Sequence, residues 1–136
     1  MQGLMAGKRG LIMGVANQRS IAWGIAKACA DAGAELAFTY QGEALERRVR
    51  PLAESVNAEI MPCDVTDDAS LDAVFKKLKS DWGKLDFVVH AIAFADKDEL
   101  TGRYVDTSPQ NFQMSLNISC YSFTAVSYTH LTLPTT

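Results

Sequence analysis

The stretch GVANQRSIAWG, residues 14–24, decides the fold because it joins an apolar segment to a helical pattern. Ahead of it, GLIMG (residues 10–14) is a short unbroken apolar run, typical of a strand buried on both faces of a parallel sheet. A loop between such a strand and a helix is a frequent binding site for a dinucleotide pyrophosphate. The loop nevertheless has no glycine between Gly14 and Gly24. The residues that replace glycine therefore need a physical explanation.

The loop departs in a defined way from G-x-x-x-G-x-G, a common dinucleotide pattern. Gly14 supplies the tight turn out of the strand, whereas the next two glycine positions fall on Gln18 and Ser20. Gln18 implies a wider loop. We expect Ser20 to cap the following helix and to donate to a phosphate oxygen, and Gly24 to permit close packing of that helix on the strand. The alternative is a plain strand–helix turn with no ligand.

The rest of the chain alternates apolar runs with helical patterns. Apolar runs predict further strands over 35–40, 59–65 and 85–95, and helical spacing predicts helices over 20–33, 43–56, 68–83 and from 109 onward. Gly33 and Gly83 are stop signals, Pro51 is expected to kink or break its helix, and Ser108 is expected to cap the helix that begins at Pro109. The expected fold class is α/β, a doubly wound, Rossmann-like parallel sheet of order 3-2-1-4, truncated after about four strands.

Composition limits the possible functions. The chain has 136 residues, is 48% hydrophobic and 21% charged, and carries a net charge of −3, which suits one modest globular domain and not a nucleic-acid binder. No apolar run approaches the roughly 20 residues of a membrane span, and no signal peptide is present, so we expect a cytoplasmic protein. The three cysteines, Cys29, Cys63 and Cys120, have no metal-binding spacing and are expected to be reduced and partly buried.

Polar and small residues follow the predicted strands at their carboxyl ends, where open α/β sheets bind ligands. Gln41 follows the second strand and can bond ribose hydroxyls. Asp64 follows the third strand and can accept a hydrogen bond from an adenine amino group. HAIAFA (residues 90–95) ends the fourth strand, and its small residues Ala91 and Ala93 would let a ribose and a nicotinamide lie close to the backbone.

Five segments carry a resemblance to a known family: GVANQRSIAWGIA, GAELAFTYQGEAL, CDVTDDASLDAVF, WGKLDFVVHAIAFA and NISCYSF. They resemble the enoyl-acyl-carrier-protein reductases of bacterial type II fatty acid synthesis, a divergent branch of the short-chain dehydrogenase/reductase superfamily. The resemblance covers about residues 3 to 126 in one register. It implies hydride transfer from NADH, with NADPH possible, to C3 of a trans-2-enoyl thioester on acyl carrier protein, and a homotetramer for the full-length enzyme.

The resemblance also implies roles for individual residues. Gly14, Ser20 and Ile21 would contact the pyrophosphate side of the cofactor, and Gln41 would face the adenosine ribose. The remaining assignments place adenine against Asp64 and Val65, the nicotinamide ribose region against Ile92, and the acyl substrate against Ala95. No metal site is expected.

The family's catalytic tyrosine and lysine would lie beyond a fifth strand. No lysine follows Tyr121 or Tyr128 in the sequence, so no residue is assigned a catalytic role and the chain is expected to be inactive alone. The helical pattern also collapses after Val126. We expect a partial NAD(P)-binding Rossmann domain over residues 1–126 and a non-native tail over residues 127–136, with a natural loop as the alternative.

Several alternatives stay open at this stage. One alternative is a non-catalytic NAD(H)-binding module, and another is a short-chain reductase that acts on a carbonyl. His90 is either an acid–base group or, more simply, a packed strand residue. The arginines Arg47, Arg48 and Arg50 suggest either a 2′-phosphate site or, on a helix rich in glutamate, a solvated face.

Overall fold

A computed structural model describes residues 3–130, and the chain divides into two compact units, Met1–Ala91 and Ile92–Thr136. The first unit holds β1 (Arg9–Met13), α1 (Ile21–Asp31), β2 (Glu35–Tyr40), α2 (Glu43–Ser55), β3 (Glu59–Pro62), α3 (Asp68–Trp82) and β4 (Phe87–His90). In the second, two 3₁₀ turns, η1 (Lys97–Glu99) and η2 (Tyr104–Asp106), precede a helical run composed of α4 (Pro109–Leu116), η3 (Asn117–Tyr121), α5 (Ser122–Thr124) and η4 (Ala125–His130). None of the helices in residues 3–130 has the length and apolar character needed to cross a membrane.

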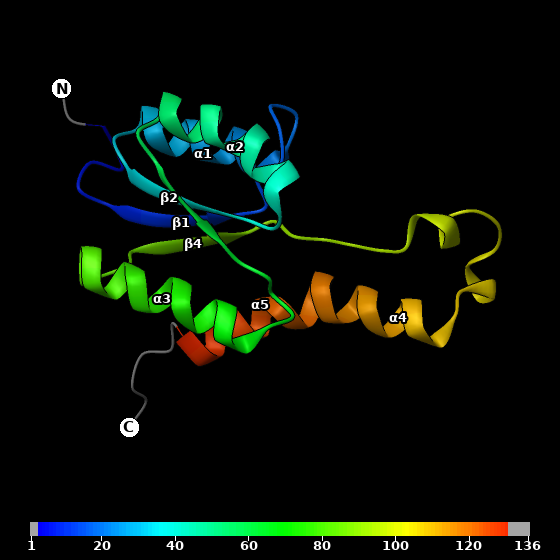
Figure 1. Cartoon of the computed structure of the whole chain (residues 1–136). Coiled ribbons are helices and arrows are strands. Elements are labelled where there is room, and N and C mark those ends of the chain that lie inside the picture. The colour runs from blue at the N-terminus through cyan, green and yellow to red at the C-terminus, as the bar shows by residue number, and fades with distance from the viewer. Residues whose placement is uncertain (1–2, 131–136) are drawn as a thin grey trace. The chain divides into compact units, whose positions relative to one another are not determined.

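The four strands of the first unit form one parallel sheet in the order β3-β2-β1-β4. Helices α1 and α2 cover one face of this sheet and α3 covers the other (Figure 1). This arrangement confirms the expected α/β, doubly wound fold and its strand order. Two strands are shorter than the apolar runs suggested, because β3 ends at Pro62 and β4 ends at His90.

The core lies between the sheet and the helices α1 and α2. Buried strand residues pack there against buried helix residues in one cluster that contains Ile12, Val15, Ala22, Ala26, Leu36, Phe38, Val49 and Ala53. Leu11 and Met13 are also buried, and they point to the opposite face because side chains alternate along a strand. On α1, Ala22 and Ala26 are buried, whereas Ile21 is 79% exposed.

Most of the predicted helix boundaries are confirmed. Gly33, with φ +102°, follows α1, and Gly83, with φ +72°, ends α3 in the left-handed conformation that favours glycine. The α3 helix begins at a cap, because the Asp67 carboxylate accepts from the amide of Ala69 at 3.0 Å. The expected break at Pro51 is absent, since α2 runs through it as one helix.

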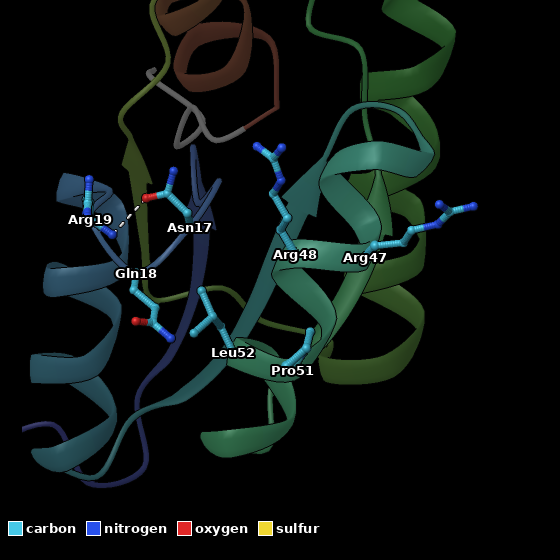
Figure 2. A pocket seen from close by; sticks show the side chains of 7 residues that line it. All are labelled: Asn17, Gln18, Arg19, Arg47, Arg48, Pro51 and Leu52. Carbon is cyan, nitrogen blue, oxygen red and sulfur yellow. Dashed lines mark hydrogen bonds between the residues drawn. The ribbon is translucent and has the colours of Figure 1, made fainter.

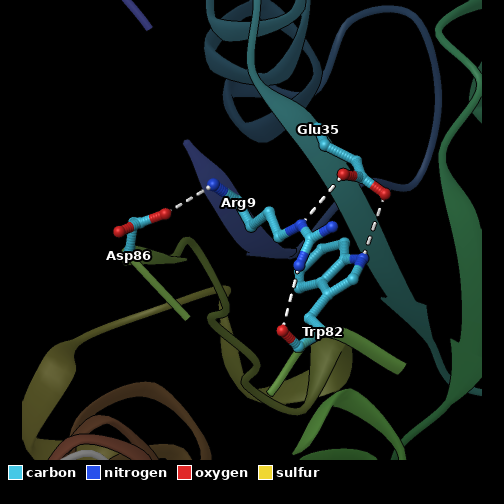
Figure 3. Close-up of polar contacts among 4 residues, drawn as sticks. All are labelled: Arg9, Glu35, Trp82 and Asp86. Carbon is cyan, nitrogen blue, oxygen red and sulfur yellow. Dashed lines mark hydrogen bonds and ion pairs between the residues drawn. The ribbon is translucent and has the colours of Figure 1, made fainter. Parts of the chain in front are cut away.

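A polar network fixes the edge of the sheet where β1 begins (Figure 3). The guanidinium of Arg9 donates to Glu35 at 3.0 Å and to the carbonyl of Trp82 at 2.9 Å, and it lies 5.8 Å from the Trp82 ring centre. The indole N–H of Trp82 donates to the other oxygen of Glu35 at 3.1 Å. The backbone amide of Arg9 donates to Asp86 at 2.9 Å. Four segments of the chain are therefore joined at the edge opposite the carboxyl ends of the strands.

In the second unit, the predicted cap at Ser108 is confirmed. Its hydroxyl accepts from the amide of Asn111 at 3.1 Å and donates to Glu99 at 2.8 Å. The helix that begins at Pro109 changes to a π-helix at Asn117–Tyr121. Residues 131–136 of the expected non-native tail lie outside the described residues. The domain over 1–126 and the tail over 127–136 therefore stay predictions.

Candidate functional site

The carboxyl ends of the strands are aligned at one edge of the sheet. Met13, the last residue of β1, is in register with Thr39 of β2 and His90 of β4. The pairing continues past the strand ends, because the Ala91 amide donates to the Met13 carbonyl at 2.9 Å. Parallel strands lie about 4.8 Å apart, so the loops that follow β1, β2 and β3 begin side by side. This edge is where the sequence placed the cofactor site.

Gly14 leaves β1 in a conformation that only glycine adopts easily. Its φ is +118°, and a Cβ built on it would lie 2.1 Å from the carbonyl oxygen of Ala91. The absence of a side chain is therefore required for the chain to turn past β4. The expectation for Gly24 is wrong, since a Cβ there would meet nothing within 4 Å. Close packing of α1 does not depend on Gly24.

Ser20 holds the loop together and does not cap the helix. It occupies the N-cap position of α1, with φ −64° and ψ 138°, but its side chain bonds no helix amide. Its hydroxyl oxygen instead accepts from the amides of Ala16 at 2.9 Å and Asn17 at 3.0 Å. The capping role predicted for Ser20 is thus wrong. Because the oxygen acts as an acceptor in both bonds, the hydroxyl hydrogen is left to donate to a ligand.

Asn17 is a loop residue that the sequence reasoning missed. Its side-chain oxygen accepts from the amide of Arg19 at 2.7 Å, and its carbonyl accepts from the amide of Ser20 at 3.1 Å. This is the turn that asparagine forms by bonding the backbone two residues onward. The signal in the sequence that could have revealed this turn is an asparagine followed by polar residues just before a helix. The side chains of Asn17 and Ser20 hold the loop in its turn through hydrogen bonds to loop amides. In the common pattern, glycines permit the turn instead.

The first turn of α1 offers backbone donors. The amides of Ile21 and Ala22 donate to no described residue, as expected for the first positions of a helix. They stand at the positive end of an eleven-residue helix. The Ile21 side chain is 79% exposed beside them. This combination suits an anion held by the amides and an apolar group that covers Ile21.

The loops after β2 and β3 complete the edge. Gln41 is exposed and precedes Gly42, which starts α2 with φ +85°. One oxygen of Asp64 accepts from the amide and the hydroxyl of Thr66, at 2.9 and 2.6 Å. Its second oxygen has no donor among the described residues, so it can accept from a ligand amino group. Val65, next to it, is half-buried.

Ionisable groups near this edge are held in their neutral forms. Burial raises the pKa of the Cys63 thiol to about 11. Burial, followed by the charge of Glu46, raises the pKa of Tyr40. Burial lowers the pKa of His90, so its imidazole is neutral at physiological pH. These shifts favour the packed interpretation of His90.

The cysteines and acidic groups of the described residues are not grouped as metal ligands would be. Within residues 3–130, no group of three His, Cys, Asp or Glu side chains could hold a metal ion. All three cysteines are free. Cys29 and Cys63 fit the expectation of partly or fully buried thiols, but Cys120 is exposed.

Two of the predicted site residues, Ile92 and Ala95, belong to the second unit. The segment that carries them is held by two hydrogen bonds within that unit. The Phe94 amide donates to the Ser119 hydroxyl at 3.0 Å, and the Asp96 amide donates to Asn111 at 2.8 Å. The first unit brings six predicted residues to its carboxyl edge: Gly14, Ser20, Ile21, Gln41, Asp64 and Val65.

An open groove of about 510 Å³ in the first unit was not foreseen. It runs between the loop that contains Asn17 and the helix α2 (Figure 2). Its lining residues are Asn17, Gln18, Arg19, Arg47, Arg48, Pro51 and Leu52.

Comparisons with known proteins agree with the geometry. The family profile described as Enoyl-(Acyl carrier protein) reductase matches residues 14–134. Over 125 residues the chain is 68% identical to enoyl-(acyl-carrier-protein) reductase (NADH) 1 of Rhizobium meliloti (strain 1021), covering 91% of this chain and 46% of that protein.

Two solved structures extend the likeness to three dimensions. An enoyl-(acyl-carrier-protein) reductase of Anaplasma phagocytophilum, in complex with NAD, is 56% identical with a TM-score of 0.91, covering 96% of this chain and 50% of that one. A Bacillus cereus enoyl-acyl carrier protein reductase, solved with NADP+ and indole naphthyridinone, is 50% identical with a TM-score of 0.89, covering 93% and 50%. The chain spans about half the length of each of these relatives.

Proposed function

Because the chain belongs to the enoyl-(acyl carrier protein) reductase family, we propose that its first unit binds the dinucleotide NADH at the carboxyl edge of the sheet. The observation that carries this proposal is the cradle formed by Gly14 and the first turn of α1. The backbone at Gly14 has no room for a side chain, and the amides of Ile21 and Ala22 are available to an anion. The residues present therefore fit a pyrophosphate.

The remaining residues of the edge suit the two ends of the adenosine. Ser20 can donate its hydroxyl hydrogen to a phosphate oxygen while its lone pairs hold the loop. Gln41 can bond ribose hydroxyls, and the second oxygen of Asp64 can accept from the adenine amino group. Val65 would pack against the adenine. The assignments of Ile92 to the nicotinamide ribose region and Ala95 to the acyl substrate stay predictions.

For the full-length protein, we propose reduction of a trans-2-enoyl thioester carried on acyl carrier protein, as part of fatty acid synthesis. NADH, when bound, supplies the hydride for C3 of the enoyl chain. The contribution of this chain is to bind and orient the dinucleotide through backbone donors at one rigid edge. A homotetramer and a cytoplasmic location are proposed for the full-length protein by family likeness.

A second candidate is a non-catalytic NAD(H)-binding module, and a third is a short-chain reductase of carbonyls. The second would use the same cradle, so the cradle does not separate it from a reductase. The 68% identity to a protein named as an NADH-dependent enoyl reductase favours the first candidate. A continuation of the gene that encodes the tyrosine and lysine pair of the family would support the reductase, and its absence would favour the binding module.

The test of the cofactor proposal is a titration of the purified chain with NADH, followed by nicotinamide fluorescence and by isothermal calorimetry. Thermal melting by circular dichroism in the same buffer establishes that the sample is folded. We expect saturable micromolar binding and a rise in melting temperature with NADH. A cooperatively melting chain that does not bind NADH would overturn the proposal.

A further inference from the structure

Both backbone polar groups of Asp64 are bonded within the loop that follows β3. Its amide donates to the Ser70 hydroxyl at 2.9 Å, and its carbonyl accepts from the Asp67 amide at 3.0 Å. The preceding residue, Cys63, is buried and donates its amide to the Tyr40 carbonyl at 2.8 Å, so the loop begins beside the end of β2. The backbone of Asp64 is therefore fixed between the sheet and α3.

Ser70 is the anchor on the helix side of this loop. It stands in the first turn of α3, directly before the buried Leu71. Burial raises the pKa of the Cys63 thiol to about 11, and a hydrogen bond with the Ser70 hydroxyl opposes this rise. The Ser70 hydroxyl therefore bonds two successive residues of the loop, through the thiol of Cys63 and the amide of Asp64. The end of β3 is thereby tied to a regular helix of fifteen residues.

Thr66 fixes the side chain of Asp64. Its amide and its hydroxyl both donate to the same carboxylate oxygen, at 2.9 and 2.6 Å. A carboxylate is planar, so fixing the backbone and one oxygen of Asp64 also determines where the second oxygen stands. That second oxygen has no donor among the described residues. Asp64 thus presents one acceptor in a defined position at the carboxyl edge of the sheet.

An acceptor held in one position can distinguish between purine bases. Adenine carries an amino group, which donates, at C6 and an acceptor at N1. Hypoxanthine carries a carbonyl, which accepts, at C6 and an N–H donor at N1. A carboxylate oxygen opposite C6 therefore pairs with adenine but meets another acceptor in hypoxanthine. A carboxylate that could shift along the base would reach the N1–H of hypoxanthine, and the distinction would be lost.

We propose that Thr66 and Ser70 are positioning residues that make the adenine end of the cofactor site selective for a 6-aminopurine. Ser70 sets the backbone of Asp64, and Thr66 sets the orientation of its carboxylate. Neither residue needs to touch the base, because both act through Asp64. The inference rests on the proposed cofactor site, and it adds a class of ligand that this site rejects, the dinucleotides of 6-oxopurines.

The test compares NADH with reduced nicotinamide hypoxanthine dinucleotide, in which a carbonyl replaces the amino group at C6 of the base. Calorimetry measures both affinities for the whole chain, and their ratio is the readout. Thr66→Val removes the hydroxyl with little change of shape, Thr66→Ser keeps it, and Thr101→Val makes the same substitution at an exposed threonine of the second unit. Ser70→Ala is matched by Ser80→Ala, at an exposed serine of the same helix. Circular dichroism melts establish that all variants are folded.

We expect the unmodified chain to bind NADH about tenfold more tightly than the hypoxanthine analogue. In Thr66→Val this ratio should fall about threefold, because the backbone amide of residue 66 still holds the carboxylate, and Thr66→Ser should keep the original ratio. Ser70→Ala should also lower the ratio, whereas Thr101→Val and Ser80→Ala should leave it unchanged. A merely structural role of Thr66 would weaken both dinucleotides equally.

Some results would overturn this inference and leave the proposed function standing. They are equal affinities of the unmodified chain for the two dinucleotides, an unchanged ratio in Thr66→Val, or an equal fall of the ratio in Thr101→Val. A folded chain that binds neither dinucleotide would overturn the proposed function as well.

Discussion

A Cβ placed on Gly14 would lie 2.1 Å from the carbonyl oxygen of Ala91, so the loop after β1 closes directly over the end of β4. This close approach couples the conformation of the loop after β1 to the pairing of β1 with β4. A side-chain rotation cannot relieve the clash, because the opposing atom is a backbone oxygen. The position is therefore restricted to glycine for reasons of space as well as φ.

Replacing Gly14 is predicted to impair both stability and cofactor binding. Gly14→Ala introduces the clash and a residue with φ +118°, and strain of this kind costs about 1–3 kcal/mol. We expect a lower melting temperature by circular dichroism and a loss of NADH binding in a fluorescence titration.

Gly24→Ala provides the control for this substitution. A Cβ at Gly24 meets nothing within 4 Å, and alanine is the better helix former by about 1 kcal/mol. This variant should melt at the same or a higher temperature. If both variants lost equal stability, the explanation from the Ala91 contact would be wrong.

Ser20→Ala is predicted to loosen the loop with a small effect on global stability. It removes the acceptor for the amides of Ala16 and Asn17, which are partly accessible to water, so the cost is about 1 kcal/mol. NADH affinity should fall about tenfold because the phosphate donor is lost too. Calorimetry on Ser20→Ala and Ser20→Thr compares loss of the hydroxyl with its retention, since threonine keeps this group. Equal NADH affinity in Ser20→Ala and the unmodified chain would remove Ser20 from the site.

The sheet could be predicted from the sequence because its signals are local. An apolar run such as residues 10–13 is typical of a strand buried on both faces of a parallel sheet, and the preference for right-handed crossovers then restricts the strand order. The cap at Ser108 was equally accessible, since Pro109 marks the first helical residue. These features depend on a few adjacent residues.

The features that could not be predicted from the sequence depend on tertiary packing. A serine before a helix can bond the helix or the loop behind it, and Ser20 bonds the loop. Ile21 and Ala22 are both apolar, and tertiary packing buries Ala22 while Ile21 stays 79% exposed. Each outcome involves residues distant in the sequence.

Acid is predicted to weaken the network at the opposite edge through Asp86. The Arg9 amide, and after it the Lys84 ammonium at 3.1 Å, hold the pKa of the Asp86 carboxyl below its usual value. A lowered pKa in the folded state stabilises the fold above the unfolded value of about 3.9, and this contribution disappears as pH falls through the folded pKa. The melting temperatures of the unmodified chain and Asp86→Asn should therefore differ most near neutral pH and converge below about pH 3.9. A difference independent of pH would contradict this account.

Thiol reactivity is predicted to follow burial. The Cys63 thiol, with a pKa of about 11, stays protonated at pH 8 and is enclosed, whereas Cys120 is exposed. A disulfide reagent added to the native chain at pH 8 should modify Cys120 first, and Cys120→Ser should remove that fast phase. Rapid modification of Cys63 in the native chain would show that the end of β3 opens more easily than its burial implies.

The last prediction concerns chemistry. Reduction of an enoyl thioester places negative charge on the thioester oxygen, and an enzyme must offer a donor to that oxygen. The family uses a tyrosine with a following lysine, and no lysine follows Tyr121 or Tyr128 in this sequence. His90 is no substitute donor of positive charge, because burial lowers its pKa and leaves it neutral. We therefore expect the 136-residue chain to bind NADH without oxidising it when a crotonyl thioester is added.

The measurement is the absorbance of NADH with and without the thioester, in a sample whose NADH binding has been established by titration. A longer form of the protein that includes the tyrosine and lysine serves as the positive control. Turnover by the chain alone that disappears in Gly14→Ala would mean that the cofactor-binding half carries its own donor to the thioester oxygen. The Tyr–Lys pair would then be dispensable for the reaction, and the search for the donor would move to the residues that follow β4.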